Sequence, residues 1–172
     1  MRTLLFLLAI APPALAAIAP PPGISATMSA SSDEEPAFSL RAEGVHVFEC
    51  KPLANDPDRY MWAFSSPETT LYQSGRPIAR STAENVFEAI DDRSSVTGSF
   101  RSRQDGGSGN LPWVLLRAES TPDAGLFAGV TAVQRVNTSG GVAPSAGCDA
   151  NNVGKEARSP FTADYYFYRR RG

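Results

Sequence analysis

The chain has 172 residues, with 16 Lys or Arg against 18 Asp or Glu, so its formal net charge at pH 7 is −2. Such a weakly acidic balance provides no basic surface for phosphate backbones, and we expect no nucleic-acid partner. The 14 glycines and 14 prolines are numerous for a helical protein but ordinary for a domain of short strands and turns.

The N-terminus has the three parts of a secretory signal peptide. Arg2 supplies a positive charge, residues 3–13 are mainly apolar, and Ala14 and Ala16 are small residues at the positions that a signal peptidase reads. The apolar run is shorter than the roughly 20 residues that a spanning helix needs. We therefore predict a signal peptide at residues 1–16, a secreted or periplasmic protein, and no transmembrane segment after its removal.

The rest of the chain divides into a leader and one domain. Residues 17–37 are rich in Ala, Pro and Ser without apolar periodicity, so we predict a flexible leader. Residues 38–172 are predicted to form a single all-β domain. The expected strands, bounded by Gly/Pro-rich loops, are residues 45–50, 59–64, 67–72, 78–82, 86–90, 95–101, 111–118, 127–136 and 161–168.

Two of these segments constrain the architecture. Residues 111–118 are apolar on both faces, which is typical of a strand in the middle of a packed structure. Residues 83–89 also have helical spacing, so a short helix is an alternative there. Eight or nine short strands with frequent loops predict an antiparallel β-sandwich or a barrel-like domain.

Cys50 and Cys148 are the two cysteines of the chain, 98 positions apart. An even number of cysteines in an exported protein favours a disulfide bond. A reactive thiol is the weaker alternative, because an exposed free thiol does not persist in an oxidising compartment. We predict a Cys50–Cys148 bridge.

Several blocks of sequence occur together in one order. They are Gly44–Cys50, Trp62–Phe64, Pro67–Tyr72, Leu111–Leu116, Val133–Pro144 and Ala163–Tyr168. Together they resemble the secreted proteins grouped as domain of unknown function 3455, over about residues 40–169. The resemblance implies export and one compact domain, and it supplies no catalytic residues. Residues 80–88 depart from the family pattern, since they lack the His, Gly-Pro and Trp expected after Gly75.

The common catalytic and metal-binding patterns are absent from the sequence. His46 is the single histidine, and no Gly-x-Ser-x-Gly elbow accompanies it. Structural zinc needs four close Cys or His ligands, and the aspartates do not follow the EF-hand pattern. We interpret the acidic residues Glu88, Asp91 and Asp92 as part of a solvated turn. We predict no metal, no cofactor and no catalytic set.

Two features are candidates for binding. Asp164, Tyr166 and Tyr168 share one face of the last predicted strand, where exposed tyrosines can stack on a sugar or contact a partner. A second sheet or a loop could instead cover these rings. Arg135 lies in an otherwise apolar strand and needs a partner, for which Asp164 is a candidate.

The sequence therefore favours a binding or interaction module over an enzyme. We expect an exported β-domain that contacts an unidentified ligand or envelope partner in the cell envelope or the extracellular space. A carboxylate-dependent, hydrolase-like enzyme and a structural component of the envelope are the alternatives.

The signal peptide yields the first testable prediction. We expect cleavage after Ala16 or one residue later, because small residues follow the short apolar run. N-terminal sequencing of the exported protein checks this, and a mature chain that starts at Met1 would contradict it.

Overall fold

A computed structural model describes residues 18–121 and 124–172, so the predicted signal peptide lies outside the described residues. The described part contains eight strands and one short 3₁₀ turn, η1 (Ala26–Met28). No helix within it is long and apolar enough to cross a membrane. The strands are β1 (Glu34–Leu53), β2 (Asp56–Gln73), β3 (Arg76–Ala83), β4 (Val86–Ala89), β5 (Ser95–Gln104), β6 (Trp113–Thr121), β7 (Val130–Gly140) and β8 (Glu156–Arg170).

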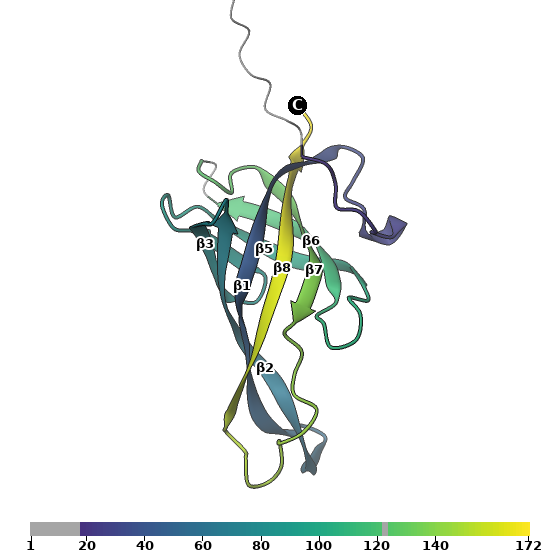
Figure 1. Cartoon of the computed structure of the whole chain (residues 1–172), viewed down its shortest axis with the longest axis vertical. Helices are drawn as coiled ribbons and strands as arrows, with labels where there is room; N and C mark the ends of the chain where they lie inside the picture. The colour runs from purple at the N-terminus through teal and green to yellow at the C-terminus, as the bar shows by residue number, and fades with distance from the viewer. Residues whose placement is uncertain (1–17, 122–123) are drawn as a thin grey trace, which may run out of the picture.

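The strands form a closed antiparallel barrel in chain order (Figure 1). Each strand pairs with the next one, and β1 pairs with β8 to close the sheet. Closure leaves no unpaired sheet edge between the first and last strands. The prediction of an all-β, antiparallel fold is confirmed, with a barrel as its form.

The first two strands are longer than the sequence pattern suggested. Residues 59–64 and 67–72 were predicted as separate strands, but both belong to β2. The register places Val47 opposite Ser66 and Phe48 opposite Phe64, so Ser65 is an extra residue in a β-bulge. Beyond the bulge, β1 and β2 continue as a ribbon outside the barrel, at the bottom of Figure 1, and the start of β8 stays paired with β1 as far as Glu49.

The segment with helical spacing forms a strand. Val86–Ala89 is β4, and it pairs with both β3 and β5. Asn85, with a φ of 55°, makes the tight turn that precedes β4. The turn and the two neighbouring strands therefore override the apolar spacing that is also compatible with a helix.

Aromatic side chains fill one end of the barrel. The ring of Phe38 stacks on Phe167 with centroids 4.8 Å apart. Phe127 and Phe87 contact the same Phe167 ring, with centroid distances of 5.1 and 5.6 Å. All four side chains are at least 92 % buried, so this end of the barrel is a packed core.

A second apolar cluster lies on the outer face of β6, β7 and β8. It consists of Met28, Leu115, Ala132 and Tyr168, all almost fully buried. Gln134 donates a 2.6 Å hydrogen bond to the backbone oxygen of Met28 and accepts one of 2.7 Å from the Tyr168 hydroxyl. The N-terminal segment therefore covers this outer wall, and β6 is apolar on both faces for that reason.

The prediction of a flexible leader at residues 17–37 differs from the structure. Strand β1 already begins at Glu34, and its first residues pair with the end of β8. Upstream, Met28 is fully buried against the barrel. The sequence pattern missed this because one anchoring side chain and main-chain pairing hold the segment, and neither leaves a periodic signal.

The predicted disulfide is confirmed. Cys50 in β1 is bonded to Cys148 in the loop before β8, with the two Cα atoms 5.3 Å apart. Trp62 in β2 donates a 2.9 Å hydrogen bond to the backbone oxygen of Ala146 in the same loop. The long loop between β7 and β8 is therefore attached to the β1–β2 ribbon at two points.

The outer cluster yields a stability prediction. Tyr168→Ala is expected to lower the free energy of unfolding by about 3–4 kcal/mol, because it opens a cavity and leaves Gln134 without one partner. Tyr166→Ala is the matched control, since Tyr166 is only partly buried and should cost clearly less. Urea unfolding of both variants checks this, and equal small losses would show that the N-terminal segment does not cover the wall.

Candidate ligand-binding site

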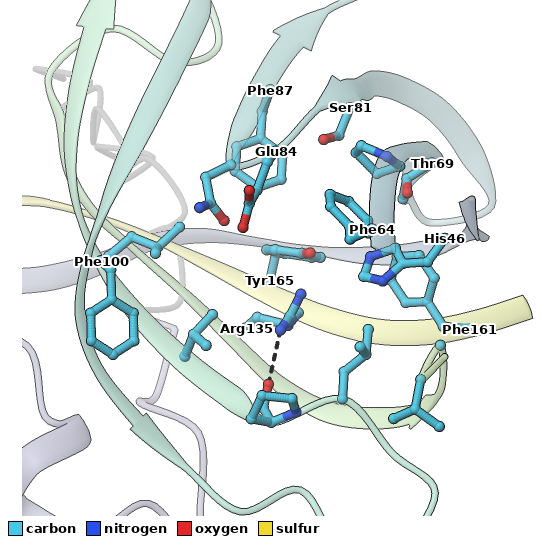
Figure 2. A pocket seen from close by; sticks show the side chains of 18 of the residues that line it. His46, Phe64, Thr69, Ser81, Glu84, Phe87, Phe100, Arg135, Phe161 and Tyr165 are labelled. Atoms are coloured by element: carbon cyan, nitrogen blue, oxygen red, sulfur yellow. Dashed lines mark hydrogen bonds between the residues drawn. The ribbon is translucent and has the colours of Figure 1, made fainter. Parts of the chain in front are cut away.

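A cavity opens at the end of the barrel from which the β1–β2 ribbon extends (Figure 2). Its volume is about 400 Å³. Phe87, Leu116 and Tyr165 line the cavity and also belong to the packed core, so they form its floor. The cavity is thus the unfilled part of the barrel interior, which the aromatic core closes at the other end.

The rim of this cavity is apolar and exposed. Phe64, Phe100 and Val142 line it and are 37 %, 65 % and 40 % exposed. In the described part of the chain, the other exposed large apolar side chains are Met61 and Val153. Exposed apolar side chains gathered around an opening are typical of a site that binds an apolar molecule.

Arg135 brings a positive charge into the cavity. It lies on β7 opposite Tyr165 of β8, and both side chains point inward. One guanidinium nitrogen donates a 3.0 Å hydrogen bond to the backbone oxygen of Pro112, whereas the buried Nε has no hydrogen-bond partner. None of the ion pairs formed by residues 18–121 and 124–172 involves Arg135.

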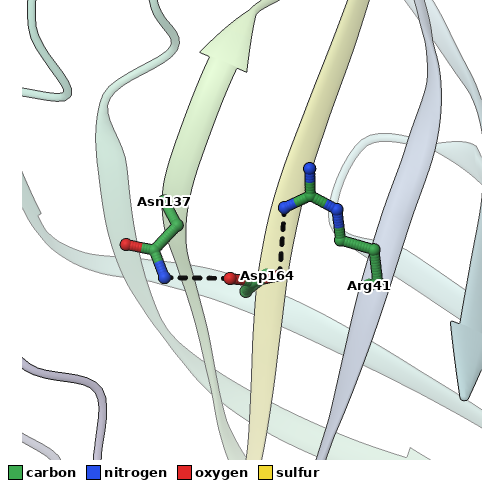
Figure 3. A network of polar contacts seen from close by, with 3 residues as sticks. All are labelled: Arg41, Asn137 and Asp164. Carbon is green, nitrogen blue, oxygen red and sulfur yellow. Dashed lines mark hydrogen bonds and ion pairs between the residues drawn. The ribbon is translucent and has the colours of Figure 1, made fainter. Parts of the chain in front are cut away.

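The predicted pairing of Arg135 with Asp164 is wrong. Asp164 lies on the outer wall, where it pairs with Arg41 at 3.2 Å and accepts a 2.9 Å hydrogen bond from Asn137 (Figure 3). The register sets Val136 opposite Asp164 and Arg135 opposite Tyr165. Successive side chains of a strand point to opposite faces, so this register puts Arg135 and Asp164 on different sides of the sheet.

The two tyrosines that the sequence singled out also lie on the outer wall. Tyr168 is buried under the N-terminal segment, and Tyr166 is partly buried beside it. Tyr166 shares a depression on that wall with Arg41, Tyr72 and Asp164. The four predicted binding residues therefore do not line one open surface, and Arg135 is the one of them that lines the barrel cavity.

His46 forms part of the cavity wall within an aromatic cluster. Its ring lies 4.6 Å from the ring of Phe161 and 4.9 Å from that of Phe64, between centroids. Burial and, to a smaller extent, the positive charge of Arg135 together lower the pKa of His46 to about 4, against an opposing hydrogen bond with the Gly141 backbone. His46 is therefore neutral at pH 7.

Four more residues with polar side chains line the cavity, namely Thr69, Ser81, Glu84 and Asn85. The buried Thr69 hydroxyl has no hydrogen-bond partner. Ser81 donates a 3.2 Å hydrogen bond to the backbone oxygen of Ala83. Glu84 is exposed in the turn between β3 and β4, at the mouth. The turn between β3 and β4 and the residues beside it thus contribute part of the opening.

Sequence reasoning found one of the main residues and missed the others. Arg135 was recognisable as a charge in an apolar strand. His46, Thr69 and Phe100 were missed as cavity residues because their common location depends on barrel closure, which joins strands far apart in the chain. The alternation of His46 with Phe48 was the available signal for an inward-facing histidine.

The shifted pKa of His46 predicts a pH effect on stability. The folded-state pKa of about 4 lies below the ordinary 6.5, so between these values the unfolded chain binds more protons. Stability that is present above pH 6.5 is therefore lost as the pH falls toward 4. The expected loss is on the order of 2 kcal/mol, allowing for solvent screening at the cavity.

The matched variant is His46→Phe, which keeps an aromatic ring and removes the titration. Urea unfolding at several pH values should show a flatter profile for this variant between pH 6.5 and 4. Carboxylate titrations are common to both proteins and cancel in the difference. Parallel profiles for the two proteins would contradict a buried, neutral His46.

The comparisons with known proteins give a family without an assigned activity. Searches of the curated proteins and of the solved structures gave no match. A family model described as "Protein of unknown function (DUF3455)" matches residues 82–169, about half of the chain. The matched part contains Arg135, Tyr165 and the β3–β4 turn, whereas His46 and Thr69 lie before it. The chain therefore belongs to the DUF3455 family.

Proposed function

We propose that this protein is a binding module whose barrel cavity holds a small, mainly apolar molecule. The observation that carries the proposal is an open cavity of about 400 Å³ with apolar walls and few inward-facing polar groups. Ligand sites in proteins commonly have volumes of about 300–1,000 Å³ and this kind of lining. The aromatic floor beneath the cavity is packed, so a ligand would enter from the rim.

Two further features support binding at this site. The Thr69 hydroxyl and the Arg135 Nε are buried without hydrogen-bond partners, and both residues line the cavity. Buried polar atoms of native proteins nearly always have partners, so two unpaired atoms in residues that line one cavity support a site whose polar contacts are completed when a ligand binds. The exposed rim residues Phe64 and Phe100 would cover the apolar part of such a molecule.

We also place this binding in the cell envelope or the extracellular space. The predicted signal peptide is the basis of that part of the proposal. The Cys50–Cys148 bridge supports it, because disulfide bonds form and persist mainly in oxidising compartments.

A neutral, apolar fluorescent probe such as N-phenyl-1-naphthylamine tests the proposal. Its fluorescence should rise on titration with the protein, because the probe leaves water for an apolar cavity. Val114→Trp should weaken this binding by about tenfold or more, since Val114 lines the cavity and the larger ring fills it.

The matched control is Val153→Trp, the same substitution at an exposed position away from the cavity. It should bind the probe as the wild type does. Thermal melts identify any variant that fails to fold. Equal binding by a folded Val114→Trp variant and the wild type, or no fluorescence change with the wild type, would overturn the proposal.

A further inference from the structure

We propose that the ligand is a monocarboxylic acid with an apolar body, and that its carboxylate binds the guanidinium of Arg135. This inference rests on the proposed function, because it names the class of molecule that enters the same cavity. It is carried by the position of Arg135 and by the charges that surround it.

The hydrogen bonds of Arg135 are incompletely satisfied. A guanidinium has five N–H donors, and the Pro112 backbone oxygen accepts from one nitrogen while the buried Nε has no partner. A carbonyl oxygen carries only a partial charge, so it does not neutralise the arginine. Holding a guanidinium beside an apolar cavity without a negatively charged partner is costly, and an anion bound to its terminal nitrogens lowers that cost.

The other titratable groups that face the cavity do not neutralise the positive charge of Arg135. His46 is neutral at pH 7 because its pKa is about 4. Tyr165 lies opposite Arg135 and forms no ion pair with it. Glu84 is exposed at the mouth and forms no ion pair with Arg135 within 4.0 Å.

The chemistry of one arginine in an apolar cavity favours a carboxylate over a phosphate. The planar guanidinium matches a carboxylate through two parallel hydrogen bonds. A phosphate monoester carries up to two negative charges at neutral pH, and Arg135 is the only Arg or Lys among the described cavity-lining residues. The single positive charge therefore matches a monoanion.

The walls of the cavity determine the size and polarity of the ligand beyond its carboxylate. From the floor at Leu116 to the rim at Phe64 and Phe100, the lining is mainly aromatic and aliphatic. The volume lies toward the lower end of the range for small-molecule sites, which suits a medium-chain or an aromatic acid.

The experiment compares three competitors that share the same alkyl chain and differ in their head groups. Decanoate, decan-1-ol and decyl phosphate are each used at neutral pH, below their micelle concentrations, to displace N-phenyl-1-naphthylamine from the full-length mature protein. Decanoate should displace the probe at a concentration at least about tenfold lower than decanol, and lower than decyl phosphate. Decanoate should also raise the melting temperature more than decanol does.

Arg135→Met tests the assigned partner, because methionine keeps an unbranched side chain and removes the charge. Decanoate should lose at least about tenfold in affinity for this variant and decanol much less, so that the preference for the acid disappears. Arg117→Met, on the outer face of β6, is the matched control and should keep the preference. If Arg135→Met does not fold, Arg135→Lys serves instead and should reduce the preference, since lysine lacks the planar fork.

The outcomes separate the inference from the proposed function. If decanol and the probe bind but decanoate has no advantage, or if decyl phosphate binds best, the carboxylate assignment is overturned and the binding module stands. If Arg135→Met retains the full preference, Arg135 is not the partner. If neither the probe nor any decyl compound binds, the proposed function itself fails.

Discussion

The pairing of β1 with β8 is the constraint on which the rest of the structure depends. It joins the two ends of the domain, converts an open sheet into a barrel and gives each strand an inner and an outer face. Gly44 of β1 permits a close approach to β2, because a Cβ atom there would lie 2.3 Å from the backbone oxygen of Glu68. The barrel then has a fixed interior. Phenylalanine side chains fill it at one end, and the cavity occupies the other end.

The outer wall is covered, so it is not the open binding surface that the sequence suggested. Tyr168, Leu115 and Ala132 would form an apolar outer patch, but Met28 and its neighbours cover them. The Gln134 amide joins the cover to the wall by accepting from Tyr168 and donating to the Met28 backbone. With that patch buried, the exposed aromatic side chains that remain grouped together are those at the cavity rim.

Local sequence patterns predicted where the strands form, but they did not predict which residues lie opposite one another in neighbouring strands. Alternation grouped Phe161 and Tyr165 on one face of β8, and the expectation of export led to the correct prediction of the Cys50–Cys148 bridge. Register and closure are long-range properties, and a shift of one residue reverses which face a side chain occupies. For that reason Arg135 was identified as unusual but was assigned to the wrong partner, and the cavity was not predicted.

The cavity separates two determinants of recognition if Arg135 holds a carboxylate. The charge of Arg135 comes from β7, deep in the sheet, where the register and the Pro112 carbonyl fix its position. The size of the opening depends on Phe64, Phe100 and the β3–β4 turn, which carry no structural role in the aromatic core. Turn residues such as Glu84 can therefore change without repacking the barrel. Substitutions in that turn would therefore alter which apolar body fits, while the preference for an acid would remain.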